Sequence, residues 1–311
     1  MAINTLSNKR GMFFTVIALV MLSLFLLTFT AVSHFSKIES EQRRVETLEG
    51  FVSSTERDLP RYLGISSYRI FFLLEKEVVQ EGNYVSNLQA SFSEGFFNGT
   101  VRGSYQELMR GATFSEIQDS LRNHAAKINA NLSLFNPQVS VTQDDPWNVK
   151  IILRVGLFAE DFSGLVIWNK TLDVVSHVPI ENFDDPLYLM NTNSLVAIKM
   201  RKSPYVTFVS GSDVSNLSSH LDNSFYVSST SAPSYLDRLQ GINAPNPYGI
   251  ESLVDLRKLA SQGIDAKDKS VVDYIYFSSA NPSACAVIPT GMPSWFKLDN
   301  EHLSAYQVSC A

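Results

Sequence analysis

The chain has few cysteines, few charges and no catalytic signature. Its 311 residues include two cysteines, Cys285 and Cys310, and 18% are charged. The net charge is −6 and no segment gathers lysine and arginine, which argues against a nucleic-acid-binding surface. No GxSxG, P-loop or GxGxxG motif occurs, so the major hydrolase and nucleotide-binding signatures are absent.

Metal-binding patterns are also lacking. The five histidines are spread out without an HExxH motif, and hydrogen-bonded or solvated roles are expected for them. The pairs Asp144–Asp145 and Asp184–Asp185 precede prolines and are expected to cap turns, with a calcium role as the alternative. Ser294 and Lys297 match an SxxK pattern, but its SDN and KTG partner motifs are missing. The sequence therefore predicts no catalytic residue, no metal site and no cofactor.

What the chain does have is one long uncharged run near its start. No charged residue occurs from Gly11 to Ser33. Residues 12–33 are therefore predicted to be a transmembrane anchor, because about 20 residues at about 1.5 Å each cross a bilayer core. Lys9 and Arg10 precede the run and should keep residues 1–11 cytoplasmic, with the rest of the chain outside. The alternative is a secretory signal cleaved after Ser33.

The two cysteines lie close together in the C-terminal part. Outside the cytoplasm the expected state is a Cys285–Cys310 disulfide. Such a bond would close a loop of about 25 residues and contribute about 3 kcal/mol. Two buried free thiols are the alternative, and a catalytic pairing of Cys285 with His302 has no local support.

Helical periodicity follows the anchor through residues 34–136. Ile38, Val45, Val52 and Leu59 recur every seven residues and predict a stalk helix continuous with the anchor. Pro60 is expected to break or kink this helix, and Gly64 to weaken the same place. A second helix is predicted over residues 65–79.

A third helix is signalled by the capping-box spacing of Thr113 and Glu116. Apolar residues at helical spacing continue to Leu132, so this helix is expected to end near Asn136–Pro137.

The period changes to two after Pro137, which predicts an antiparallel meander over residues 137–190. Residues 191–311 are predicted to form a mixed or β subdomain, with a short helix at 251–259 and a buried strand at 271–277. The predicted fold class is α+β: a transmembrane helix continuing into a long helix, further helices packed on an antiparallel sheet, and the C-terminal subdomain.

Four N-x-Ser/Thr sequons could accept N-glycans outside the membrane. They begin at Asn98, Asn131, Asn169 and Asn216.

Lys9, Arg10 and Gly11 stand directly before the apolar run, and an amphipathic helix and a helix-plus-sheet domain follow. This layout resembles archaeal type IV pilins and pilin-like proteins, which carry class III signal peptides. The resemblance implies that a membrane peptidase cuts after Gly11, leaving Met12 as the mature N-terminus, and that the apolar helix can pack into a filament core.

The sequence departs from that family in three ways. The first mature residue would be Met12 where typical members carry glutamine, no acidic residue lies at the fifth position, and the ectodomain is larger than that of a major pilin. These differences favour a minor or pilin-like surface protein over a major filament subunit.

Three hypotheses of function follow. The first is a pilin-like surface protein with a structural, filament-associated or adhesive role, whose partners are the lipid bilayer and other pilin-like subunits. The second is a membrane-tethered ligand-binding or sensing ectodomain. The third is an extracytoplasmic enzyme, which would need a pocket with converging titratable groups.

Overall fold

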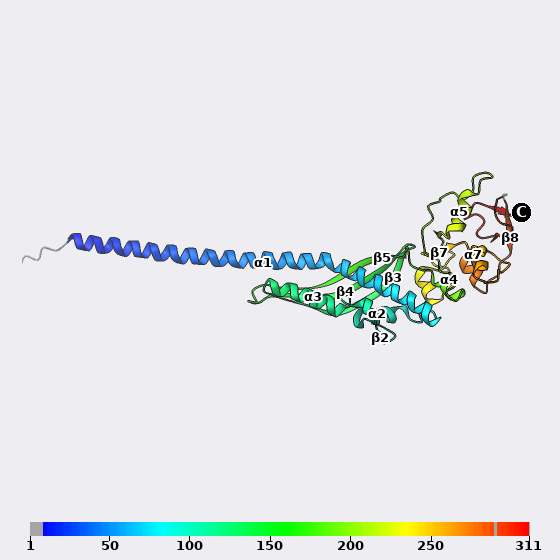
Figure 1. Cartoon of the computed structure of the whole chain (residues 1–311). Coiled ribbons are helices and arrows are strands. Elements are labelled where there is room, and N and C mark those ends of the chain that lie inside the picture. The colour runs from blue at the N-terminus through cyan, green and yellow to red at the C-terminus, as the bar shows by residue number, and fades with distance from the viewer. Residues whose placement is uncertain (1–8, 289–290, 311) are drawn as a thin grey trace, which may run out of the picture.

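The computed structural model describes residues 9–288 and 291–310, with side chains from Phe13 onward except those of Ser36 and Ile288. Figure 1 shows an elongated molecule with a projecting helix at one end, a helix-and-sheet domain next to it, and a region of short elements at the other end. The elements make an α+β fold with a C-terminal mixed subdomain, which confirms the predicted fold class.

Helix α1 (Lys9–Glu81) is one continuous helix of 73 residues. At about 1.5 Å per residue it is about 110 Å long. From Phe13 to Phe35 its side chains are nearly all exposed, although most of them are apolar. Among the described residues, α1 is the one helix whose length and composition suit a membrane span.

Pro60 lies inside α1, so the predicted break at this position is wrong. Figure 1 shows α1 changing direction between its blue and cyan parts while remaining a helix. A proline inside a helix costs about 3 kcal/mol. The flanking Leu59 and Leu63 are buried, and burial of a leucine contributes about 1.5–3 kcal/mol. Packing of these two side chains therefore offsets the lost hydrogen bond, and the predicted second helix at 65–79 is the continuation of α1.

Helix α1 continues through Gly64. A Cβ atom at this position would lie 2.8 Å from Ser176 Oγ of the neighbouring strand. The missing side chain lets the helix approach the sheet closely.

The sheet consists of β3 (Ala130–Asp145), β4 (Asn148–Asp161) and β5 (Ile167–Pro179), paired antiparallel in the order β3-β4-β5. This arrangement confirms the predicted meander. Every second side chain of β4 is buried, as a strand with one covered face requires. The buried residues are Val149, Ile151, Leu153, Val155, Leu157 and Ala159.

Three helices cover this face of the sheet. Helix α1 contacts β4 and β5, and α3 (Phe114–Lys127) contacts β3. Helix α2 (Leu88–Asn98) adds Phe96 to the same core, which contains Leu59 of α1 and Ile117 of α3. The short elements β1 (Thr100–Val101), β2 (Ser104–Tyr105) and η1 (Glu107–Met109) connect α2 to α3. The capping box of Thr113 and Glu116 is present, as predicted.

The expected end of α3 near Asn136–Pro137 is wrong, because β3 already begins at Ala130. Asn129 adopts a left-handed conformation with φ of 56° between the two elements. Leu132 fits the predicted helical stripe, but Leu132 and Leu134 also alternate with polar residues and pair with β4. The sheet therefore includes residues that the prediction gave to the helical segment 34–136. Pro137 lies where the β3 register shifts, which strands tolerate.

The C-terminal region is built from short elements. Its helices are α4 (Pro186–Asn191), α5 (Ser215–Asn223), α6 (Tyr235–Gln240), α7 (Leu256–Ser261) and α8 (Asp273–Phe277). Its strands are β6 (Tyr226–Ser228), β7 (Ile250–Ser252), β8 (Ala284–Ile288), β9 (Lys297–Asp299) and β10 (Ser309–Cys310). They pair antiparallel as β6-β7 and β10-β8-β9.

Two local predictions fail in this region. The buried strand predicted at 271–277 is mostly helix α8, and the helix predicted at 251–259 is split between β7 and α7. A short apolar run is compatible with either a buried helix or a buried strand, so packing decides between them. Here Ile275, Tyr276 and Phe277 lie in one helical turn, and all three are buried.

The core does not stop at residue 190. One cluster of buried side chains joins α1 and the sheet to Tyr226, Tyr235 and Tyr276. A second cluster, around Leu217 and Phe296, belongs to the C-terminal region. The predicted subdomain 191–311 therefore shares part of its core with the helix-and-sheet domain.

Glu75 joins the end of α1 to this region. Its side chain is almost fully buried, and its Oε1 accepts a hydrogen bond of 2.8 Å from Tyr235. The pKa of Glu75 is raised from 4.5 to about 8. Burial is the main cause, the hydrogen bond from Tyr235 acts in the opposite direction, and the nearby charge of Asp184 adds to the rise. Glu75 is therefore mainly neutral at pH 7.

The raised pKa of Glu75 makes stability depend on pH. The folded state favours the neutral acid, so this contribution is fully present below about pH 4.5 and is lost as pH rises through about 8. The loss should be on the order of a few kcal/mol. We expect urea unfolding of the detergent-solubilised chain to show falling stability between pH 5 and 9, and Glu75→Gln to remove most of this fall. The exposed Glu107→Gln is the control, and equal pH profiles for Glu75→Gln and the wild type would contradict the assignment.

Candidate functional site

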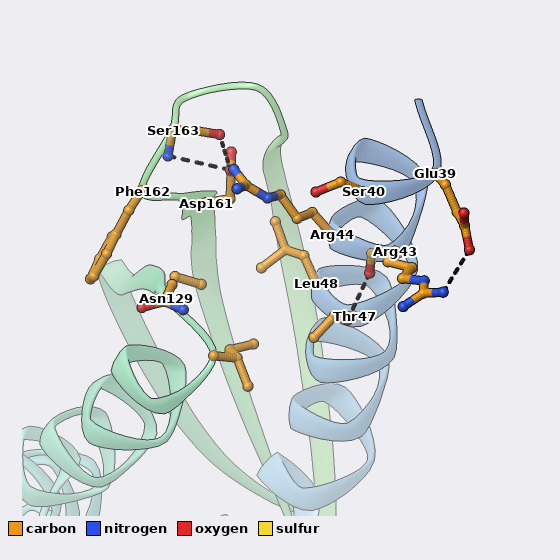
Figure 2. Close-up of a pocket in the computed structure, with 12 residues that line it drawn as sticks. Glu39, Ser40, Arg43, Arg44, Thr47, Leu48, Asn129, Asp161, Phe162 and Ser163 are labelled. Atoms are coloured by element: carbon orange, nitrogen blue, oxygen red, sulfur yellow. Dashed lines mark hydrogen bonds and ion pairs between the residues drawn. The ribbon is translucent and has the colours of Figure 1, made fainter. Parts of the chain in front are cut away.

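A cleft of about 680 Å³ lies beside α1 at the end of the domain that faces the projecting helix. Its walls are residues 39–48 of α1, the α3–β3 connection at residues 128–130, and the β4–β5 turn at residues 161–163. Figure 2 shows α1 and the turn diverging above the cleft, with Leu48 between them. Leu48 is the first buried leucine of α1, so the cleft forms where the helix leaves the core.

The β4–β5 turn is organised by Asp161. Its carboxylate accepts hydrogen bonds from the Ser163 hydroxyl, from the Ser163 backbone and, at 2.9 Å, from the Val166 backbone. These bonds, with the Ser163 hydroxyl first, lower the pKa of Asp161 below its usual range, so it is an anion at neutral pH. The Phe162 backbone donates to the Asn129 carbonyl at 2.9 Å, which ties the turn to the other wall.

Charges of both signs line the cleft. Arg44 extends from α1 toward the turn and approaches Asp161 at 3.8 Å (Figure 2). Arg43 points away from the turn and pairs with Glu39 at 2.6 Å, and both of these side chains are exposed. Ser40, Thr47 and Ser163 add hydroxyl groups. The cleft can therefore hold a small group that carries both charges, such as a phosphate with an amine.

Among the described lining residues, the hydroxyl bonded to a carboxylate is that of Ser163, and its partner Asp161 is a weak base because its pKa is lowered. Of the residues described around the cleft, none is a histidine, cysteine or lysine. The geometry suits binding by charge and hydrogen bonds, and it offers no side chain poised for proton transfer near neutral pH.

The sequence did not indicate this cleft. Its three walls come from segments separated by about 80 and 30 residues, and their residue types are common on surfaces. Arg44 and the turn before Gly164 are visible in the sequence as a helix charge and a turn signal, but nothing local places them together.

The leader residues Lys9, Arg10, Gly11 and Met12 belong to α1, and their side chains lie outside the described residues. The predicted processing site between Gly11 and Met12 therefore stays a prediction.

No protein-family model, curated protein or solved structure matches the chain. The site must be interpreted from its own geometry.

The predicted Cys285–Cys310 disulfide is confirmed, with Cα atoms 5.6 Å apart. Cys310 lies on β10 and pairs with Val287 of β8, so the bond fastens the end of the chain to this small sheet. The alternatives of free thiols and of a catalytic Cys285 are wrong, because the sulfur is bonded.

The sequon asparagines occupy different surfaces. Asn131 on β3 and Asn169 on β5 are exposed and point away from the covered face of the sheet. Asn98 ends α2 and is also exposed, whereas Asn216 is half-buried and donates to the Thr207 carbonyl at 2.9 Å. Glycan attachment stays a prediction at all four.

His302 is buried in the C-terminal region. Its Nδ1 lies 2.6 Å from Asp299 Oδ1, and its Nε2 lies 3.3 Å from Glu251 Oε2 and 3.1 Å from the Tyr274 hydroxyl. Burial would lower the pKa of His302, but the bonds to Asp299 and Glu251 outweigh it and raise the pKa to about 10. A charged imidazolium cannot accept a proton, so this cluster is an ion network rather than a general base.

Arg238 forms the other buried ion network, and sequence reasoning missed it. Its guanidinium is fully buried and donates to Asp185 at 2.6 Å, to Asp273 at 2.9 Å and to the Ile250 carbonyl. Asp185 also caps α4 through the Leu187 backbone, as the predicted turn-capping role suggests. The network connects α4, α6 and α8, and a single arginine in a short helix gives no signal of it in the sequence.

The disulfide should stabilise the C-terminal region by about 3 kcal/mol, because it closes a loop of about 25 residues. We expect the double variant Cys285→Ser/Cys310→Ser to unfold at lower urea concentration than the oxidised wild type. Non-reduced peptide mapping should find the two cysteines joined. Full alkylation of both thiols without reductant would contradict the bond.

Removal of the Arg238 charge should be far more damaging than loss of a surface arginine. Arg238→Met leaves the buried Asp185 and Asp273 without a cationic partner and should cost about 3–5 kcal/mol. The matched control is Arg110→Met, which loses an exposed pair with Glu107 and should cost about 1 kcal/mol or less. Urea unfolding followed by tryptophan fluorescence measures both. Equal unfolding midpoints would show that the network is not structurally important.

Proposed function

We propose that the chain is a membrane-anchored extracytoplasmic surface protein with a pilin-like architecture and a structural, filament-associated or adhesive role. The observation that carries this proposal is α1, a single helix that is apolar and exposed along its first part and buried in the domain core along its last part. An exposed apolar helix of this length requires a bilayer or other apolar helices around it.

Continuity of the helix supports a structural role. Between the apolar part and the sheet, α1 has no loop that would let the domain reorient freely. The domain is therefore held at a fixed direction to its anchor, as a subunit that packs beside copies of itself requires. The partners of the apolar part would be lipid and the equivalent helices of other subunits.

Two further features support the proposed side of the membrane. Lys9 and Arg10 precede the apolar part, and cationic residues favour the cytoplasmic side. The disulfide at the other end of the chain suits an oxidising compartment.

The cleft favours a second candidate, a membrane-tethered ectodomain that binds a ligand. Its mixed charges and its volume of about 680 Å³ suit a small polar molecule. A pilin-like protein can hold such a site, so the two candidates differ in processing and assembly rather than in the cleft.

Processing of the leader separates these candidates. If a pilin-type peptidase acts, it removes residues 1–11 and with them both charges that would resist movement of the helix out of the bilayer. We expect N-terminal sequencing of the protein from its native membrane to begin at Met12. Substitution of Gly11 by valine should block cleavage, whereas the control Gly50→Ala should not, because a methyl group there meets no neighbour.

Other start points would contradict the proposal. A start at Met1 would leave a plain tethered ectodomain, and a start near His34 would show a secreted protein without an anchor. Protease added to intact cells should cut after Ser33, and protection of that region until lysis would overturn the orientation.

A further inference from the structure

The β4–β5 turn, residues 162–166, exposes large apolar side chains. Phe162 is 66% exposed and Leu165 is 60% exposed, and the adjoining Ile167 is 57% exposed. Turns normally carry small polar residues, and clustered apolar groups in water mark a contact surface.

This turn is held in place rather than loose. Asp161 binds the Ser163 and Val166 backbone groups, the Phe162 backbone binds Asn129, and Arg44 of α1 approaches Asp161. The fold therefore fixes the position of the turn relative to α1.

The turn lies on the side of the domain from which the apolar part of α1 projects (Figure 1). In Figure 2 α1 runs from Glu39 at the top to Thr47 below, and the turn rises above Ser163 to at least the level of Glu39. Leu165 follows Ser163 by two residues along the turn. Phe162 points away from α1, on the outer flank.

With α1 anchored as proposed, the turn lies close to the headgroup layer of the bilayer. Glu39 follows Ser33 by six residues, which is about 9 Å along a helix. The headgroup region of one leaflet is about 5–8 Å thick. Packed elements lie about 10 Å apart. A tilt of α1 of about 20° toward the turn therefore moves the turn about 3 Å closer to the bilayer. A tilted helix therefore brings the turn toward that layer.

We propose that the β4–β5 turn is a second membrane contact, in which Leu165 and the adjoining Ile167 enter the interface of the leaflet that α1 crosses. This contact rests on the proposed anchoring of α1. One membrane-spanning helix alone leaves the tilt of the domain relative to the membrane free. A second contact beside the helix, at the turn, fixes this tilt.

The cleft between α1 and the turn belongs to the same surface. It opens toward the membrane side, and the exposed Arg44 presents a positive charge there, whereas Asp161 is buried and held by Ser163, Val166 and Arg44. A lipid phosphate matches the charge of Arg44, so headgroup phosphates lie in the cleft when the turn meets the bilayer.

The test places a tryptophan on the turn. The full chain with Leu165→Trp is inserted into lipid nanodiscs at one chain per disc, with bromine atoms near the top of the acyl chains as quenchers. We expect additional quenching over the wild type, which carries Trp147, Trp168 and Trp295. The control Val206→Trp lies at an 89% exposed position in the C-terminal region and should show none.

A second variant checks that the turn itself enters the interface. Addition of Ile167→Asp to Leu165→Trp should return the quenching to the wild-type level while the chain stays in the disc. An inserted chain whose Leu165→Trp signal equals that of Val206→Trp would overturn the contact. A blue shift that arises only with two or more chains per disc would overturn it in favour of contact with a second copy. A chain that fails to enter discs would instead refute the anchor, and the contact with it.

Discussion

Burial of the last part of α1 against the covered face of β4 is the contact on which the rest of the structure depends. Leu59, Leu63 and Leu74 of the helix share one core with Leu153 and Val155 of the strand. Because the same helix is continuous with the exposed apolar part, helix geometry fixes the distance and direction between the domain and the anchor. A flexible linker would have left both undefined.

The cleft and the β4–β5 turn follow from where this contact ends. Leu48 is the first buried leucine of the helix, and before it α1 diverges from the sheet. Strands β4 and β5 continue past that point and turn at Asp161, so a charged cleft opens between helix and turn. The exposed apolar residues of the turn therefore lie beside the exposed part of α1 that precedes Leu48. The exposed apolar turn, the cleft and the projecting apolar helix are consequences of one packing arrangement.

The opposite end of α1 is held by buried polar groups. Glu75 reaches Tyr235, and Arg238 binds Asp185 and Asp273 in the adjoining core. Ion pairs of this kind gain little over apolar packing, because desolvation offsets most of the attraction. They do require specific partners, so they set how the short elements of the C-terminal region join the helix-and-sheet domain.

The sequence by itself determined the features that depend on local pattern. The uncharged run to Ser33, the capping box at Thr113 and the alternation along β4 predicted the exposed apolar helix, the start of α3 and the meander, because neighbouring residues decide helix caps and strand faces. Tertiary structure decided the rest. Continuation of the helix through Pro60 required burial against a distant strand, and the contact of Arg44 with Asp161 joined segments far apart in the chain. Such long-range burial can exceed local preferences of a few kcal/mol, and no local pattern records it.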